Sequence, residues 1–133
     1  MTLLHDASGQ LRRLRTACLQ LARDFREWWL LPSRREERGR KLLREWLSRE
    51  QLAQYDARGY FEVIGCQTGK RYRIYRGNGN NVIELDDAAL PRMGWCFMPC
   101  DPLVVTDVML AQKIALETDE RGALAVAHNF TPV

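Results

Sequence analysis

Residues 60–75 read YFEVIGCQTGKRYRIY, two short runs rich in β-branched and aromatic residues on either side of a glycine-containing turn. In the second run, the apolar residues Tyr72 and Ile74 alternate with Arg71 and Arg73. A period of two is typical of a strand with one buried and one exposed face. The segment therefore predicts an antiparallel hairpin with an apolar face and an arginine-bearing face.

Further strands and a helix are predicted after this hairpin. The dipeptide Asn78-Gly79 is preferred in tight turns between strands, and residues 82–85 and 95–98 are again apolar and β-rich. We therefore expect a four-stranded antiparallel meander. Residues 106–129 then carry a broad apolar face at helical spacing, with Thr106 as the expected N-cap. Because a sheet with one apolar face needs a cover, this helix is expected to pack on it.

The residues before the hairpin have a helical period. Apolar side chains recur at alternating steps of three and four over residues 4–28, which is the a and d pattern of a heptad repeat. A helix over 9–30 is expected to end before Pro32, because proline disfavours helix in the residue that precedes it. Capping boxes at Ser33–Glu36 and Ser48–Gln51 predict two further helix starts.

The predicted fold class is α+β. A helical arm of two to three helices would occupy residues 1–47, and the meander with its C-terminal helix would form a core domain over residues 48–133. The length of 133 residues, with 46% hydrophobic and 28% charged residues, is ordinary for a globular protein and excludes a disordered tail. No apolar run reaches the ~18 residues of a membrane span. Four cysteines without an export signal predict free thiols in the cytoplasm.

The net charge of +3 is distributed unevenly along the chain. Residues 11–50 contain twelve Arg or Lys and six Asp or Glu, whereas residues 101–133 contain two and five. Arginine makes bidentate contacts with phosphates and carboxylates. Basic side chains interleaved with an aromatic ring on a sheet can also contact a phosphate backbone and stack on a base.

This pattern gives a candidate nucleic-acid-binding set, which is Arg34, Arg35, Arg38, Arg71, Arg73 and Tyr75. Binding through it would be weak and independent of sequence, since no base-reading motif is present. The alternative is a solvated face on which Glu62 and Glu84 pair with the arginines across the sheet.

The heptad-like stripe gives a second candidate surface. Its association residues are Leu11, Leu14, Leu21, Phe25 and Trp28. An uncovered apolar patch of this length is unusual on a soluble monomer. We therefore expect it to bind a protein partner or a second copy of the chain, most simply as an antiparallel homodimer. The alternative is that the stripe packs within its own domain.

Few residues could carry out catalysis or bind a metal. Cys96 and Cys100 lie four apart and Cys66 could approach them, but this spacing differs from the paired cysteines of zinc sites. The loop Gly65–Arg71 superficially resembles a phosphate-binding loop, yet a strand follows it where that motif needs a helix N-terminus and its free amides. We therefore expect an interaction module without enzymatic activity, metal or cofactor.

Several motifs together resemble a family of small bacterial proteins of unknown function, found mainly in soil and root-associated proteobacteria. The motifs are Gly59–Gly65, Thr68–Ile74, Asn81-Val82, Cys96-Phe97 and Asp107–Lys113. The resemblance covers residues 45–130 and implies a bacterial, cytoplasmic protein, but no activity. The hairpin, the cysteine-containing strand and the helix are also similar to SWIM-type zinc modules. The Cys-x-Cys and Cys-x-His ligands of those modules are missing here, which implies that the metal has been lost.

Overall fold

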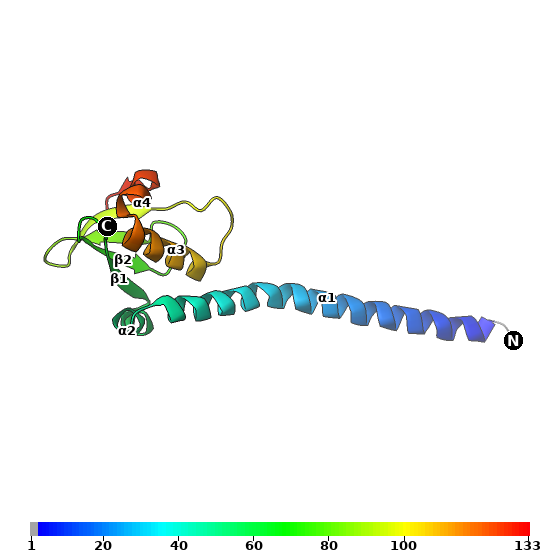
Figure 1. Cartoon of the computed structure of the whole chain (residues 1–133). Coiled ribbons are helices and arrows are strands. Elements are labelled where there is room, and N and C mark those ends of the chain that lie inside the picture. Colours follow the sequence, from blue (N-terminus) through cyan, green and yellow to red (C-terminus); the bar gives the residue numbers. More distant parts are fainter. Residues whose placement is uncertain (1–2) are drawn as a thin grey trace. The chain divides into compact units, whose positions relative to one another are not determined.

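The computed structural model describes residues 3–133, apart from the side chains of residues 3–8 and 28–33. Over the described residues the fold class is α+β, with a five-stranded antiparallel sheet and helices before and after it (Figure 1). The elements are α1 (Leu3–Trp46), α2 (Arg49–Arg58), β1 (Tyr60–Ile64), β2 (Arg71–Tyr75), β3 (Val82–Leu85), β4 (Pro91–Cys96), α3 (Val105–Thr118), α4 (Glu120–Val126) and β5 (His128–Phe130).

Helix α1 is a single element that includes Pro32. The predicted helix end before Pro32 and the predicted new start at Ser33 are therefore wrong. The residues on both sides are rich in Leu, Arg and Glu, whose helix propensity is high. This propensity favours continuation through a proline that costs roughly 3 kcal/mol in a helix interior.

The chain divides into two compact units, Met1–Arg35 and Glu36–Val133, and the division falls inside α1. Leu43 and Leu47, near the end of this helix, are buried in the core of the second unit. The last turns of α1 therefore belong with the sheet, whereas we expected the core domain to begin at residue 48.

The strand order is β1-β2-β3-β4-β5, with each neighbouring pair antiparallel. The first four strands form the expected meander, although β4 begins at Pro91 and ends at Cys96, whereas the sequence predicted this strand at residues 95–98. The fifth strand lies where the sequence predicts the end of a helix, so that part of the prediction is wrong. A Cβ atom on Gly94 of β4 would lie 2.3 Å from the ring of Phe130. The aromatic ring of β5 thus fills the space that this glycine leaves, an arrangement that stabilises glycines in strands.

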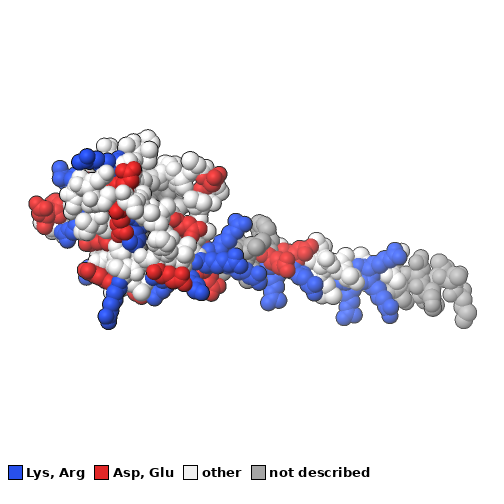
Figure 2. Space-filling view, in the orientation of Figure 1, with Lys and Arg blue, Asp and Glu red and all other residues white. Residues whose placement is uncertain are grey.

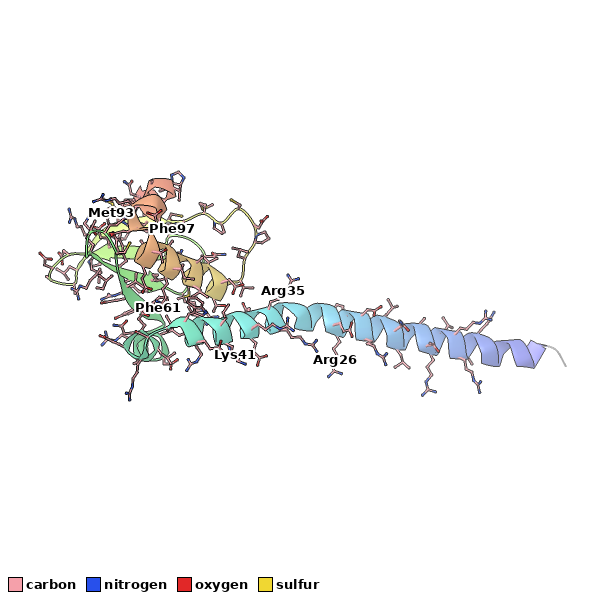
Figure 3. The ribbon with its side chains drawn as sticks, in the orientation of Figure 1. Arg26, Arg35, Lys41, Phe61, Met93 and Phe97 are labelled. Atoms are coloured by element: carbon pink, nitrogen blue, oxygen red, sulfur yellow. The ribbon has the colours of Figure 1, made fainter. Side chains whose placement is uncertain are left out.

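One face of the sheet forms the core, as the alternation predicts. Phe61 pairs with Ile74 and Val63 with Tyr72, and all four side chains are buried (Phe61 is labelled in Figure 3). Helix α3 contacts β1 and β2 and adds Met109, Leu110 and Leu116 to the same cluster. Each large side chain that is fully buried contributes roughly 1.5–3 kcal/mol. The C-terminal helix is therefore the cover that the sequence predicts.

The predicted ends of α2 are confirmed, whereas the predicted cap of α3 is wrong. Ser48 accepts a hydrogen bond from the amide of Gln51 in a complete capping box, and Gly59 ends α2 in the left-handed conformation at φ 72°. The N-cap of α3 is Val104, not Thr106. Thr106 is instead buried, and a Cβ atom on Gly39 of α1 would lie 2.3 Å from its hydroxyl oxygen. The close approach of α1 to the start of α3 within the second unit therefore requires a glycine at position 39.

Candidate functional site

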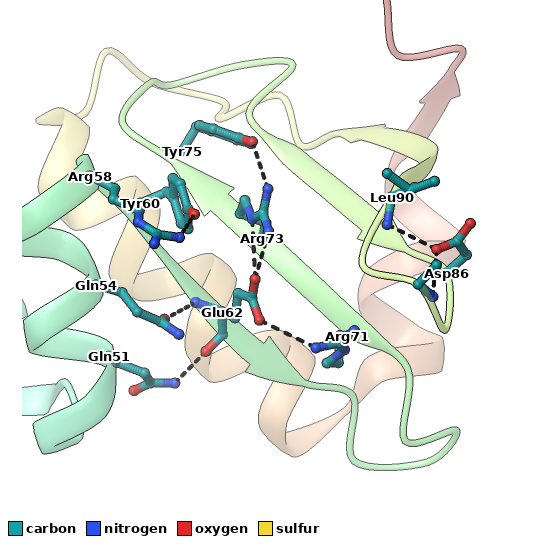
Figure 4. A network of polar contacts seen from close by, with 11 residues as sticks. Gln51, Gln54, Arg58, Tyr60, Glu62, Arg71, Arg73, Tyr75, Asp86 and Leu90 are labelled. Carbon is teal, nitrogen blue, oxygen red and sulfur yellow. Dashed lines mark hydrogen bonds and ion pairs between the residues drawn. The ribbon is translucent and has the colours of Figure 1, made fainter.

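The sheet face opposite the core carries the predicted cluster of arginines and tyrosines (Figure 4). Arg73 pairs with Glu62 in the strand register, and Tyr75 pairs with Tyr60. Arg71, Arg73 and Tyr75 therefore lie on one face, as predicted. They come from a single strand, β2, and the carboxylate of Glu62 on β1 lies among them.

Arg73 is held by several neighbours. Its Nε and Nη2 atoms donate to Glu62 Oε1 at 3.2 and 2.9 Å, and Nη1 donates to the Tyr75 hydroxyl at 3.3 Å. The guanidinium carbon also lies 4.4 Å from the centroid of the Tyr60 ring, a favourable cation–π distance. Partial burial lowers the pKa of Arg73, but the hydrogen bonds to Tyr75 and Glu62 outweigh it and shift the pKa upward. These hydrogen bonds use three of the five N–H donors of the guanidinium.

Arg71 is held less firmly. Its Nη1 atom lies 3.9 Å from Glu62 Oε2, and the side chain is 38% exposed. This distance exceeds the 2.7–3.2 Å of an N–H···O hydrogen bond, so the guanidinium keeps its donors available. Two arginines share one carboxylate here, and the sheet face is less basic than its sequence suggests.

The outer edge of the sheet is closed by α2. The backbone amide of Glu62 donates to Gln54 Oε1 at 2.8 Å, and the backbone oxygen of Glu62 accepts from Gln51 Nε2 at 2.9 Å. Exposed strand edges invite pairing with another strand. The two glutamines occupy the backbone groups of β1 that a second strand would use.

The remaining predicted site residues lie on α1. Arg34 and Arg35 are exposed in the first unit, and Arg38 is exposed in the second. Leu11, Leu14, Leu21 and Phe25 are between 62% and 68% exposed, whereas the side chain of Trp28 lies outside the described residues. Basic side chains lie along this helix (Figure 2), and those of Arg26 and Arg35 extend outward from it (Figure 3).

A buried carboxylate that the sequence analysis missed anchors the β1–β2 loop. Glu120, the first residue of α4, is 0% exposed. It accepts hydrogen bonds from the amides of Gln67 at 2.9 Å and Thr68 at 2.8 Å, from the Tyr72 hydroxyl at 2.6 Å, and from the Thr68 hydroxyl. A strand follows this loop, as predicted, and two of its backbone amides bind a carboxylate of the chain itself.

These hydrogen bonds set the ionisation of the cluster. Burial alone would raise the pKa of Glu120, but the hydrogen bonds from Thr68, Tyr72 and the two amides lower it to about 2. Burial, followed by the hydrogen bond to Glu120, raises the pKa of Tyr72. At neutral pH the pair is therefore a carboxylate and a neutral phenol, which suits a structural clasp.

Glu84 is also buried, so the prediction that it faces solvent is wrong. It lies opposite Tyr72 in the register, on the core face of β3. Its carboxylate accepts a hydrogen bond from Trp95 Nε1 at 3.2 Å and lies 2.9 Å from Lys70 Nζ. Arg92 Nη1 is 3.8 Å away. Glu62 does pair with Arg71 and Arg73 across the sheet, as expected.

The cysteines carry free thiols, with Cys66 and Cys100 exposed and Cys96 half-buried. Among the described residues, no group of three or more His, Cys, Asp or Glu side chains is placed to hold a metal ion. No helix in the described part of the chain has the length and apolar character needed to cross a bilayer.

Comparison with known proteins finds no relative. No protein-family model matches the chain, and no curated protein or solved structure matches it significantly. The resemblance to small bacterial proteins therefore stays a prediction, and any assignment of function has to rest on the residues themselves.

Proposed function

We propose that the chain is a non-enzymatic interaction module that associates with a second copy of itself through the N-terminal part of α1. The observation that carries this proposal is the exposure of Leu11, Leu14 and Leu21, at 66%, 63% and 68%, along one side of a helix. These residues occupy successive a and d positions of a heptad pattern, the arrangement that a partner helix covers.

The stripe offers a partner helix a continuous apolar surface. Covering the exposed two-thirds of these three leucines on both copies contributes roughly 6–12 kcal/mol, at 1.5–3 kcal/mol for each fully buried side chain. Because association joins two chains, the population of such a dimer depends on protein concentration.

Charge favours an antiparallel pair. Residues 11–18 contain three arginines and no acidic residue, whereas residues 19–27 contain two arginines and two acidic residues. A parallel pair would bring the two arginine-rich segments together. An antiparallel pair places each of them beside the neutral segment of the other copy. The preference is reduced by salt, since surface charges are screened beyond roughly 8 Å at physiological ionic strength.

Side-chain volume favours the same orientation. In a fully overlapping antiparallel pair, Phe25 faces Leu14 of the second copy, and Cys18 faces Leu21 of the second copy. A parallel pair would instead stack phenylalanine on phenylalanine and cysteine on cysteine. Alternating large and small residues across an interface fills space evenly, so antiparallel layers keep the two helices at a constant separation.

The test is a comparison of matched aspartate substitutions on α1. Leu14→Asp combined with Leu21→Asp should dissociate the full-length dimer, because it places charges in the apolar layers. Leu19→Asp is the control, since Leu19 is 65% exposed but lies off the stripe. Size-exclusion chromatography with light scattering measures the mass of each protein. Equal dissociation by the control would show that the stripe is not the interface.

Weak, sequence-independent nucleic-acid binding is a second candidate function. Its support is the exposed arginines on the first unit, which are Arg12, Arg13, Arg15, Arg23, Arg26, Arg34 and Arg35. The sheet face gives it less support, because Arg71 and Arg73 share the carboxylate of Glu62. Titration of a labelled oligonucleotide at two salt concentrations tests it, since counterion release makes such binding steeply salt-dependent.

A further inference from the structure

A cavity of about 370 Å³ lies where the β1–β2 loop meets the β3–β4 turn. This volume lies within the range of small-molecule sites. Its charged lining residues are Lys70, Arg71, Arg92, Asp86 and Asp87, and the apolar side chains of Ile64 and Leu85 complete it. The cavity is remote from the association stripe in sequence and belongs wholly to the second unit.

Three cationic side chains reach this cavity from three segments of the chain. Lys70 ends the β1–β2 loop, Arg71 begins β2, and Arg92 lies on β4. The strand register shifts at Arg92, because Leu85 pairs with Pro91 whereas Glu84 pairs with Met93. Such bulges redirect a side chain and are common beside functional sites. The extra residue in β4 is therefore the arginine that lines the cavity.

The buried carboxylate of Glu84 positions two of these cations. Glu84 is 3% exposed, and its Oε1 atom lies 2.9 Å from Lys70 Nζ and 3.8 Å from Arg92 Nη1. Both cationic groups therefore approach the same oxygen atom. A buried ion pair is a poor source of net stability compared with apolar packing. Because these contacts add little net stability, we assign to Glu84 the role of positioning the two cationic side chains beside the cavity.

The two arginines keep donors for a ligand. The contacts of Arg92 with Glu84 and of Arg71 with Glu62, at 3.8 and 3.9 Å, are longer than hydrogen bonds. The side chains of Arg92 and Arg71 are 63% and 38% exposed. Because a guanidinium carries five N–H donors, each can bind an anionic oxygen without leaving its present partner.

The two aspartates of the cavity differ in their hydrogen bonds and exposure. Asp86 Oδ1 accepts hydrogen bonds from the amides of Ala88 and Leu90, each at 2.9 Å, and so closes its own turn (Figure 4). Asp87 is exposed. Its charge opposes an anion in the cavity and limits the affinity.

We infer that this cavity binds a phosphate group. Arginines match the oxygens of a phosphate with paired donors, and lysine supplies a compact positive charge. The three cationic residues that line the cavity outnumber its two aspartates, so the lining carries a net positive charge. The phosphate can belong to a small metabolite or to the backbone of a nucleic acid, and the chemistry of recognition is the same in both.

The experiment is a titration of the full-length protein at low salt, followed by amide chemical shifts in NMR spectra. The probes are pyrophosphate and a short single-stranded oligonucleotide without a terminal phosphate. Binding of pyrophosphate should shift the amides of residues 68–71, 86–90 and 92, and Arg92→Gln should weaken it at least fivefold. Asp87→Asn should strengthen it, because the substitution removes the opposing charge. Arg76→Gln is the control, because Arg76 follows the other end of β2.

The two probes distinguish a small phosphorylated molecule from a nucleic-acid backbone as the ligand. Pyrophosphate binding that exceeds oligonucleotide binding assigns the cavity to a small phosphorylated molecule, and the reverse assigns it to a nucleic-acid backbone. Unchanged spectra with both probes would overturn the inference. So would equal losses for Arg92→Gln and Arg76→Gln, because these would indicate only a general attraction to positive charge. The mass of the protein in solution, which tests the proposed dimer, is measured separately and does not depend on phosphate binding.

Discussion

Replacement of Glu120 by glutamine should destabilise the second unit by roughly 3 kcal/mol at neutral pH. The pKa of this carboxyl is lowered from 4.5 to about 2 in the folded protein, and each pKa unit corresponds to roughly 1.4 kcal/mol. Glutamine keeps the shape of the side chain but cannot accept hydrogen bonds at both terminal atoms. If its oxygen faces the amides of Gln67 and Thr68, its NH2 group faces the hydroxyls of Thr68 and Tyr72, whose hydrogens then lose their acceptor, and the charge that all four donors stabilise is lost.

The pH dependence of this effect has a definite sign. A carboxyl whose pKa is lowered by folding contributes stability above its unfolded pKa, and that stability is lost as the pH falls toward the folded pKa. The contribution of Glu120 is therefore complete above about pH 5 and falls to less than half by pH 3, given a folded pKa of about 2. The difference between the wild type and Glu120→Gln should shrink over the same interval.

Urea unfolding monitored by tryptophan fluorescence, repeated from pH 3 to pH 7, measures both quantities. Glu45→Gln is the matched control, because Glu45 is exposed in the second unit, and substitutions of exposed residues usually change the free energy of unfolding by no more than about 0.5 kcal/mol. A Glu120→Gln protein as stable as the wild type at pH 7 would show that the carboxylate does not stabilise the fold. A difference that stays constant on acidification would show that its ionisation is not involved.

Three other predictions follow from the same contacts. Deletion of residues 1–35 should leave a folded protein, whereas deletion of residues 1–47 should destabilise it strongly in thermal unfolding, because it also removes Leu43 and Leu47 from the core. Gly39→Ala should lower the free energy of unfolding by roughly 1–3 kcal/mol through overpacking against Thr106. Gly9→Ala, which meets no atom within 4 Å, should instead raise helix content in circular dichroism. Glu62→Gln should increase oligonucleotide affinity several-fold in a fluorescence titration, because it releases Arg71 and Arg73. An unchanged affinity would show that the sheet face does not contact nucleic acid.

Local patterns predicted much of the fold. The alternation in Arg71–Tyr75 correctly separated the two faces of β2, and the capping box at Ser48 correctly placed the start of α2. Both signals depend on residues within one or two turns of each other. The cluster of Arg71, Arg73 and Tyr75 was predictable for the same reason, because a single strand carries it.

Features that depend on distant partners were missed. Strand β5 forms because Phe130 covers Gly94, and no local pattern in His128–Phe130 indicates a strand. Thr106 looked like a helix cap, but the approach of Gly39 buries it. Pro32 looked like a helix end, although flanking helix-forming residues continue α1 past it.

The partners of the two buried carboxylates, Glu84 and Glu120, could not be predicted from the sequence either. Glu84 shares the parity of Val82, so strand alternation alone could have placed it on the core face. Its cationic partners come from a loop and from a bulge in β4, which alternation cannot locate. Glu120 is separated by about fifty residues from the loop that it holds. Nothing in the sequence near Glu120 distinguishes it from a solvated helix residue.

Self-association through the apolar stripe of the first unit is tested by sedimentation equilibrium of the full-length protein over a wide range of concentrations. We expect the mass to rise from that of one chain to that of two as concentration increases, and a Leu14→Asp, Leu21→Asp protein to stay at one chain throughout. A wild-type protein that keeps the mass of a single chain at every concentration would rule out the proposed dimer.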